Sequence, residues 1–308
     1  LRQRVHFDNV LSILFAATFA LALKALVILF IYSHDPLGGV FLPVYRWVRT
    51  TGVGEITTIA PTFARIFFQS QIYTLIAFFL LFVQKQKKIS IQHSAFSIIF
   101  FSSIILSLSR SFWLASIVTL CIALLSLRQW KKIVEILAVG IAGFFLIVAV
   151  VNFPYPRTQG GSLASLIEDR ATETQEAGIG SRWSLLPPLF DTIRAHWFLG
   201  AGFGATVTYK SSDPRIVESS ARGNNFYTTY AFEWGYLDLW LKFGFLGIMM
   251  YGVLLWKIGR GLFQHFNSGL FFGFIALLLT NIFSPYLNHP IGIGILLNIS
   301  MHSTEGAI

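Results

Sequence analysis

The sequence predicts an all-α fold, a polytopic bundle of transmembrane helices that carries one large, partly helical loop on one side. Of the 308 residues, 55% are hydrophobic and only 12% are charged, and the mean hydropathy is +0.66. A soluble domain has more charge than this on its surface. Apolar runs of membrane-spanning length also recur along the chain, which indicates several crossings of a bilayer.

About eight apolar runs are expected to span or nearly span the membrane. Several are shorter than the roughly 20 residues that a spanning helix needs. The runs cover residues 10–32, 66–83, 92–108, 112–127, 133–152, 234–256, 268–284 and, most weakly, 290–301. The chain opens Leu-Arg-Gln-Arg, without an initiator Met or a signal-peptide pattern. We therefore expect an N-terminal truncation, with further helices before Leu1.

Groups of cations at alternate connections set the orientation. They are Arg2 and Arg4; Lys85, Lys87 and Lys88; Arg128, Lys131 and Lys132; and Lys257 and Arg260. The positive-inside rule makes their side cytoplasmic. The chain then divides into helices over 1–152 with a short external segment at 33–65, a large external loop over 153–233, and helices over 234–308. The net charge of +9 comes with no basic patch of stacking aromatics, so it does not indicate nucleic-acid binding.

The external loop is expected to be partly ordered and functional, because a connection of this length in a compact protein is usually either functional or disordered. Its segment 180–204 reads GSRWSLLPPLFDTIRAHWFLGAGFG, with apolar residues at helical spacing. Since Pro187 and Pro188 disturb the first turns of a helix, we expect a helix over about 188–196. The glycines at 200, 202 and 204 then end it.

Three charges lie where the loop enters the next span. Asp238 and Lys242 are spaced i, i+4 and can pair, so a structural ion pair or the lining of a polar cavity explains them. Glu233 has no cation at i+3 or i+4. Counted back from Lys257 along a straight helix, it lies roughly 36 Å away, at the outer headgroup level. A carboxylate there is a candidate general base; the alternative is an interfacial acid in water.

Three arginines on the external side come from separate segments: Arg65, Arg110 and Arg182. Guanidinium groups bind phosphate oxygens bidentately and stay charged in a partly apolar environment. The three are therefore candidate ligands of a lipid pyrophosphate, with snorkelling or a helix-end charge as the alternative. Arg215 and Arg222, in a polar, Ser-rich stretch, are candidates for contact with an acceptor.

No metal or cofactor chemistry is predicted. The seven histidines are scattered, with no pair at i+3 or i+4, and the lone Cys121 lies in an apolar run. His196 is suited to capping the end of the loop helix. The glycines of residues 200–204 lack the preceding strand of a dinucleotide site, and neither a Walker sequence nor a G-x-S-x-G appears.

Three stretches taken together resemble the superfamily of O-antigen ligases and O-antigen polymerases, which are bacterial membrane glycosyltransferases. Residues 107–115 (SLSRSFWLA) are like its Ser-Arg turn, and 180–204 are like its loop helix, which begins with an Arg and ends in a His-containing turn and a Gly-x-Gly. Residues 236–247 (YLDLWLKFGFLG) are similar to the helix after its large periplasmic loop. The resemblance covers most of 60–300.

One departure separates the chain from the ligases. They usually carry His-Asn three residues before the Tyr of the last motif, with that His as the proposed base, whereas this chain has Glu233 and Trp234. Since a carboxylate can also take a proton from a hydroxyl, the departure favours a repeat-unit polymerase over a ligase.

The resemblance implies transfer of a glycan from an undecaprenyl-diphosphate carrier to a sugar hydroxyl, with no metal. The acceptor is a lipid-linked repeat unit in a polymerase and lipid A core in a ligase. In this reading Glu233 is the base, Arg110 and Arg182 hold the diphosphate with help from Arg65, and the acceptor sugar meets Arg215, Arg222 and His196. The setting is the bacterial inner membrane, with the large loop periplasmic and a chain-length regulator protein as a possible partner.

A different class stays open, namely a polysaccharide transporter or lipid flippase. Transporters show charges or broken helices near the membrane midplane and an inverted repeat. Lys24 is the only clearly buried charge outside the stretch that contains Glu233, and the sequence has no internal repeat, which favours surface chemistry over transport.

Overall fold

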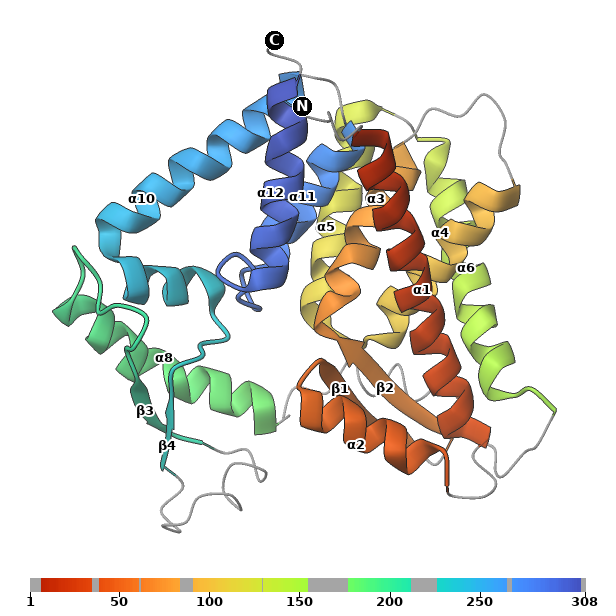
Figure 1. Cartoon of the computed structure of the whole chain (residues 1–308), viewed down its shortest axis with the longest axis horizontal. Coiled ribbons are helices and arrows are strands. Elements are labelled where there is room, and N and C mark those ends of the chain that lie inside the picture. Colours follow the sequence, from red (N-terminus) through yellow and green to blue (C-terminus); the bar gives the residue numbers. More distant parts are fainter. Residues whose placement is uncertain are drawn as a thin grey trace, which may run out of the picture. The chain divides into compact units, whose positions relative to one another are not determined.

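The computed structural model describes residues 7–34, 39–60, 62–83, 91–128, 130–154, 177–211, 226–264 and 268–305. Over these residues the chain is mostly helical (Figure 1). It divides into two compact units, one of residues 1–171 with 262–279 and one of residues 172–261 with 280–307. The proposed division at 152/153 and 233/234 concerns the membrane boundary and stays a prediction.

Six of the described helices in the first unit overlap the apolar runs. They are α1 (Phe7–His34), α3 (Ile72–Val83), α4 (Ile91–Leu106), α5 (Arg110–Leu127), α6 (Lys132–Val151) and α11 (Ser268–Thr280). Among these, α4 packs on α6, where the Ser102 hydroxyl donates to the Gly143 carbonyl at 3.1 Å. Small residues allow such close approach of helices in lipid, where helices associate by packing and hydrogen bonding.

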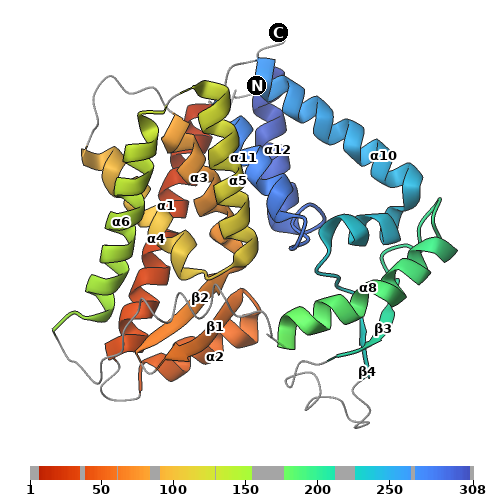
Figure 2. The same cartoon turned by 180° about the vertical axis from the view of Figure 1, so that it is seen from behind.

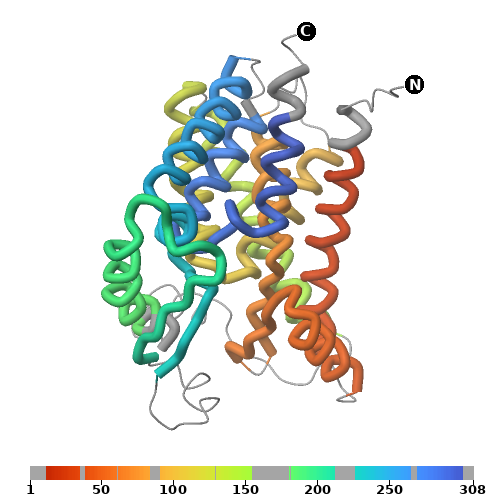
Figure 3. Tube along the Cα trace, turned by 60° about the vertical axis from the view of Figure 1, so that its left-hand side comes forward, coloured from red at the N-terminus to blue at the C-terminus, as the bar shows by residue number. Residues whose placement is uncertain are grey.

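The segment between α1 and α3 folds into a short helix and a hairpin. Helix α2 (Phe41–Thr51) precedes strands β1 (Gly54–Ala60) and β2 (Phe63–Phe68), which pair antiparallel with Thr57 opposite Arg65. In Figure 3 the tube leads from α1 into α2 and this hairpin. The all-α prediction did not include the strands, and the span expected from residue 66 was wrong at its start, because 66–68 belong to β2 and α3 begins at Ile72.

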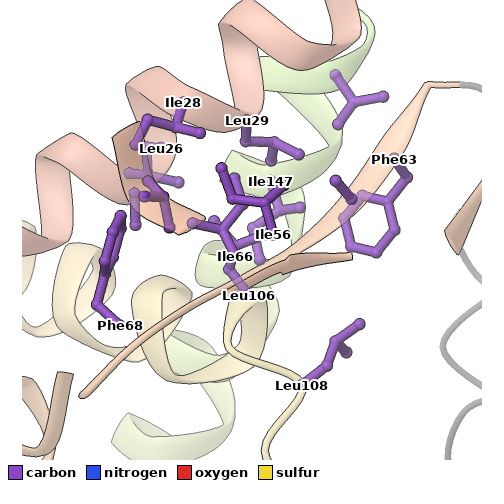
Figure 4. Close-up of a cluster of buried hydrophobic side chains, with 14 of the residues drawn as sticks. Leu26, Ile28, Leu29, Ile56, Phe63, Ile66, Phe68, Leu106, Leu108 and Ile147 are labelled. Carbon is purple, nitrogen blue, oxygen red and sulfur yellow. The ribbon is translucent and has the colours of Figure 1, made fainter. Parts of the chain in front are cut away.

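The hairpin is held by the core of the first unit. Figure 4 shows Ile66 of β2 close to Ile147 of α6, with Leu29 of α1 nearby and Phe68 of β2 farther along the strand, all in one buried cluster. Leu29, Ile66 and Ile147 are fully buried, and each such side chain stabilises the fold by about 1.5–3 kcal/mol. The Tyr32 hydroxyl also donates to the Ala60 carbonyl at 3.0 Å. The last turns of α1 are thereby tied to the hairpin.

The described helices make this a helical membrane protein. Four of them are long and apolar enough to cross a bilayer: Ser12–His34, Arg110–Leu127, Lys132–Val151 and Gly235–Gln264. Shorter apolar helices cover Gln69–Val83, Ile91–Leu106, Gly269–Thr280 and Pro290–Ser300. On α6, large apolar side chains such as Val134 and Phe145 are exposed, as expected of a surface that faces lipid.

The second unit contains α8 (Ala177–Ala195), β3 (Val207–Lys210), β4 (Phe226–Thr229), α10 (Gly235–Gln264) as far as Gly261, and α12 (Pro290–Glu305). Strands β3 and β4 pair antiparallel, and α8 lies beside β3 (Figure 2). The loop helix was expected to start near residue 188, and this was wrong. Helix α8 runs through Pro187 and Pro188 because its apolar stripe at Leu185, Leu189 and Ile193 is buried on both sides of them.

Candidate active site

Glu233 and Arg182 form an ion pair. Nε of Arg182, in α8, donates to Oε2 of Glu233, which lies two residues before α10. The two side chains keep 43% and 51% of their surface exposed, so both also face solvent. In the sequence, a partner was sought only within one helix, but Glu233 precedes α10 and its partner comes from a segment about fifty residues earlier.

Trp183 and Trp234, the residues that follow Arg182 and Glu233 in the sequence, make further contacts between the two segments. The indole Nε1 of Trp234 donates to the Arg182 carbonyl at 3.2 Å. The rings of Trp183 and Trp234 meet edge to face, with centroids 5.6 Å apart, an arrangement that aromatic rings favour. Side chain, backbone and ring contacts thus join two consecutive residues of α8 to two consecutive residues before α10.

A small apolar core anchors both α8 and the segment that leads into α10. Leu185, Leu189 and Ile193 of α8 are buried against Phe232 and Leu241. Phe232 is fully buried and directly precedes Glu233. The carboxylate therefore projects from an anchored backbone, which limits how far it can move relative to Arg182.

Helix α10 is interrupted at Gly244, and the loop after α8 fills the break. In an unbroken helix the amide of Phe245 donates to the carbonyl of Leu241. Here the Leu241 carbonyl accepts from Ala201 N at 2.7 Å, and Phe245 N donates to the Trp197 carbonyl at 2.8 Å. One helical hydrogen bond is thus replaced by two bonds to the loop.

The next pair of residues, Lys242 and Leu246, also exchanges its helical hydrogen bond for two bonds to the loop. The Lys242 carbonyl accepts from Gly202 N at 3.1 Å, and Leu246 N donates to the Phe198 carbonyl at 3.2 Å. The carbonyls of Leu241 and Lys242 and the amides of Phe245 and Leu246 thus find partners in the loop, as backbone groups must where lipid replaces water. The bend in α10 is visible in Figure 1, and it is the place where the glycine-rich loop after α8 is attached.

The kink changes the distance expected between Glu233 and Lys257, while the depth of Glu233 in the membrane stays a prediction. The count of roughly 36 Å from Lys257 assumed one straight helix and is wrong, because the backbone at Gly244 is not helical. Residues 245–264 alone have about 30 Å of helical rise, which matches the hydrocarbon thickness of a bilayer. Residues 235–243 then form a separate helical segment that leads from Glu233 to the kink.

Asp238 and Lys242 form the predicted ion pair, with Lys242 Nζ 2.7 Å from Asp238 Oδ1. Their side chains are only 1% and 11% exposed. The side-chain amide of Asn288 also donates to Asp238 Oδ2, and the ammonium lies over the ring of Phe203, 5.7 Å from its centroid. These partners explain how the two charges are kept in a buried place, so a structural role suffices.

In the first unit, Arg65 is fixed to the turn that leads to Arg110. Its Nη1 lies 3.3 Å from Glu55 Oε2, and its Nε donates to the Ser107 carbonyl at 2.9 Å. Arg110 begins α5 two residues after Leu108, whose φ of 44° makes the turn sharp. Arg65 of strand β2 is therefore bonded directly to the Ser-Arg turn. The contact of Arg65 with the Ser107 carbonyl and its ion pair with Glu55 were not predicted.

The other candidate residues are Arg215, Arg222 and His196. Arg215 and Arg222 lie outside the described residues. His196 is exposed in the turn after α8, with its backbone amide 3.2 Å from the Thr192 carbonyl. Over the described ranges, no three His, Cys, Asp or Glu side chains are grouped so that they could hold a metal ion. Metal independence itself stays a prediction.

The fold defines a polytopic helical membrane protein with a charged pair and aromatic residues at the junction of α8 and α10. A family model described as O-antigen ligase matches residues 95–252, about half of the chain. The chain therefore belongs to the O-antigen ligase family, and the resemblance read from the sequence is confirmed. Its members are glycosyltransferase-like membrane enzymes of polysaccharide biosynthesis. Neither a curated protein nor a solved structure matches the chain.

Proposed function

We propose that the protein is a repeat-unit polymerase. It transfers a glycan from an undecaprenyl-diphosphate carrier to a hydroxyl of another lipid-linked repeat unit. The observation that carries this proposal is the ion pair between Arg182 and Glu233. It joins the two kinds of group that the reaction needs, an acceptor of a proton and a donor of hydrogen bonds to phosphate, in one partly exposed place.

Glu233 acts as the general base. Only the ionised form of the carboxylate can accept a proton. As the acceptor oxygen attacks the anomeric carbon, the C–O bond to the diphosphate breaks and the hydroxyl proton passes to Glu233. The undecaprenyl diphosphate leaves with the bonding electron pair, and the carboxylic acid later loses its proton to water.

Arginines stabilise the negative charge that develops on the leaving diphosphate. A guanidinium has five N–H donors, and the Nε of Arg182 uses one of them on Glu233. Arg182, Arg110 and Arg65 bind the diphosphate in place of a divalent metal. No step then requires a metal or another cofactor. Arg215, Arg222 and His196 contact the acceptor glycan.

The proposed setting follows from the positions of the cations. The chain crosses the inner membrane of a bacterium about eight times, with the basic connections cytoplasmic and residues 153–233 periplasmic. The diphosphate of the carrier lies at the outer surface of this membrane, and a chain-length regulator protein binds beside the enzyme. Membership of the family favours this enzyme over a transporter or flippase.

The alternative enzyme is an O-antigen ligase, which the description of the matching family favours. Both enzymes use the same donor and differ in the acceptor. Glu233, in the place where the ligases usually carry their His, supports the polymerase.

Deletion of the gene in its native host separates the two enzymes. Loss of a polymerase leaves single repeat units on the final acceptor, whereas loss of a ligase leaves long polymer on the lipid carrier. We expect single units, and complementation with the wild-type chain should restore long chains. Polymer that accumulates on the carrier would reject the polymerase in favour of the ligase.

A further inference from the structure

A small polar pocket lies at the corner where α2 meets the β1–β2 hairpin, within the first unit. Its volume is about 250 Å³, and it is lined by Arg49, Gly52, Gly54, Glu55, Phe67 and Gln69. Drug-sized ligands occupy pockets of about 300–1,000 Å³, so this one suits a smaller group. The mechanism proposed above does not use it.

The pocket is built from fixed backbone. Gly52 ends α2 in the left-handed conformation, with φ at 65°. A Cβ on Gly54 would lie 2.2 Å from the Phe67 carbonyl oxygen, so the two strands leave no room there for a side chain. The amide of Gln69 donates to the Val53 carbonyl at 3.1 Å. These contacts hold the walls in place without a ligand.

The lining chemistry matches a sugar ring better than a bare anion or a hydrocarbon. Arg49 and Gln69 offer N–H donors, while Glu55 offers a carboxylate that accepts from hydroxyl groups. A lone phosphate would be repelled by that carboxylate, and an alkyl chain would offer these polar groups no hydrogen bond. A hydroxyl can both donate to Glu55 and accept from its neighbours, and the ring of Phe67 offers an apolar face.

The pocket is joined to the predicted diphosphate ligands by direct contacts. Glu55, which lines it, holds Arg65 at 3.3 Å, and Arg65 is bonded to the Ser107 carbonyl, three residues before Arg110. A sugar in the pocket would thus lie beside the group that binds the diphosphate. In a lipid-linked donor the first sugar is attached directly to the diphosphate.

We propose that this pocket binds a sugar ring of the lipid-linked donor, next to the diphosphate, and so contributes to the choice of donor glycan. The proposal rests on the function proposed above and adds a site to it. Glu55 is shared between the pocket and Arg65, which couples recognition of the sugar to the position of a phosphate ligand.

The test measures binding of two lipids to the full chain in nanodiscs. One probe is undecaprenyl diphosphate, and the other is the undecaprenyl-diphosphate-linked repeat unit extracted from the native host. Arg49→Ala and Gln69→Ala remove pocket donors. Arg46→Ala is the matched control, because Arg46 is exposed on the same helix one turn earlier and does not line the pocket. Thermal unfolding confirms that each variant is folded.

We expect Arg49→Ala to weaken binding of the glycan-bearing lipid about 10-fold, as loss of one charge-assisted hydrogen bond does, and Gln69→Ala to weaken it about 3-fold, as loss of a neutral one does. Binding of undecaprenyl diphosphate should stay unchanged in them, and the control should bind both lipids normally. The pocket proposal would be overturned if folded Arg49→Ala and Gln69→Ala bound both lipids equally weakly, or bound both lipids as tightly as the wild type. Failure of the wild-type chain to bind either lipid would instead reject the proposed function.

Discussion

Gly200 and Gly244 lie so close together that neither residue can carry a side chain. A Cβ on Gly200 would be 2.5 Å from the amide nitrogen of Gly244, and a Cβ on Gly244 would be 2.4 Å from that of Gly200. Both residues have positive φ, 77° and 69°. This contact attaches the loop after α8 to the break in α10, and it thereby holds in register the two segments that carry Arg182 and Glu233.

Alanine at either glycine should separate these segments. We expect Gly200→Ala and Gly244→Ala each to lower the free energy of unfolding by at least about 1–3 kcal/mol, the cost of one strained residue, with the backbone clash added. Thermal unfolding in detergent measures this. Gly252→Ala is the control, because a Cβ there meets nothing within 4 Å. Equal stability of all three variants would show that the close contact is not needed.

A substitution at Gly202 measures the cost of a positive φ without a steric clash. It has φ of 81°, but a Cβ on it would have no neighbour within 4 Å. Gly202→Ala should therefore cost only the conformational strain of about 1–2 kcal/mol. A loss as large as that of Gly200→Ala would argue against packing as the cause.

The buried pair of Asp238 and Lys242 should behave as a structural unit. Removal of one partner leaves an uncompensated charge, so Asp238→Asn or Lys242→Met should destabilise the protein by about 3–5 kcal/mol. The double variant should be less destabilised than the sum of the two single changes. A double-mutant cycle on thermal unfolding measures this coupling, and strictly additive losses would contradict the pairing.

His289 should make stability depend on pH. Its Nδ1 accepts from Ile291 N at 3.3 Å at the start of α12, and burial lowers the pKa of its imidazole below the ordinary value of 6.5. The unfolded chain then binds a proton at higher pH than the folded one. Stability from this group is complete above pH 6.5 and is lost as pH falls through the lower, folded pKa.

The variant His289→Asn keeps a side-chain acceptor for the helix start but does not titrate. It should show a smaller loss of melting temperature between pH 7 and pH 5 than the wild type. The comparison must be made in the same detergent and at the same ionic strength. Identical pH profiles would remove His289 as the source of the dependence.

Trp234 should act as a positioning residue for the candidate site. Trp234→Phe keeps an aromatic ring but loses the hydrogen bond to the Arg182 carbonyl. A net loss of about 0.5–1.5 kcal/mol corresponds to a rate about 2- to 13-fold lower, with unchanged affinity for the donor. Trp240→Phe is the matched control, since its indole binds the Trp197 carbonyl instead. A weaker effect of Trp234→Phe than of the control would contradict this role.

The long apolar runs could be predicted because hydropathy and length suffice to recognise them, and α1, α5 and α6 lie where they were expected. The hairpin was not predicted, although the β-branched residues of GEITTIA followed by Pro61 are typical of a strand and turn. Apolar strand residues beside an apolar helix form one continuous run, so hydropathy alone cannot divide them at Ile72.

For the candidate site, spacing along one helix identified the pair of Asp238 and Lys242. It could not identify the pairing of Glu233 with Arg182, because their contact depends on how α8 packs near the start of α10. The glycines at 200, 202 and 244 were visible, yet the docking of one backbone on another is a tertiary property. The sequence identified the charged residues of the candidate site, but only the fold showed which residues most of them contact.

The most direct test of the proposed mechanism is a single-turnover assay of the purified chain in nanodiscs with lipid-linked repeat units, comparing Glu233→Gln with the wild type. Loss of a general base lowers the rate of transfer by about 10²- to 10⁴-fold. We expect such a loss, with binding of the donor retained. Arg182→Lys should also have less than full activity, because lysine lacks the bidentate geometry of arginine. Transfer at the wild-type rate by Glu233→Gln would contradict the assignment of Glu233 as the base.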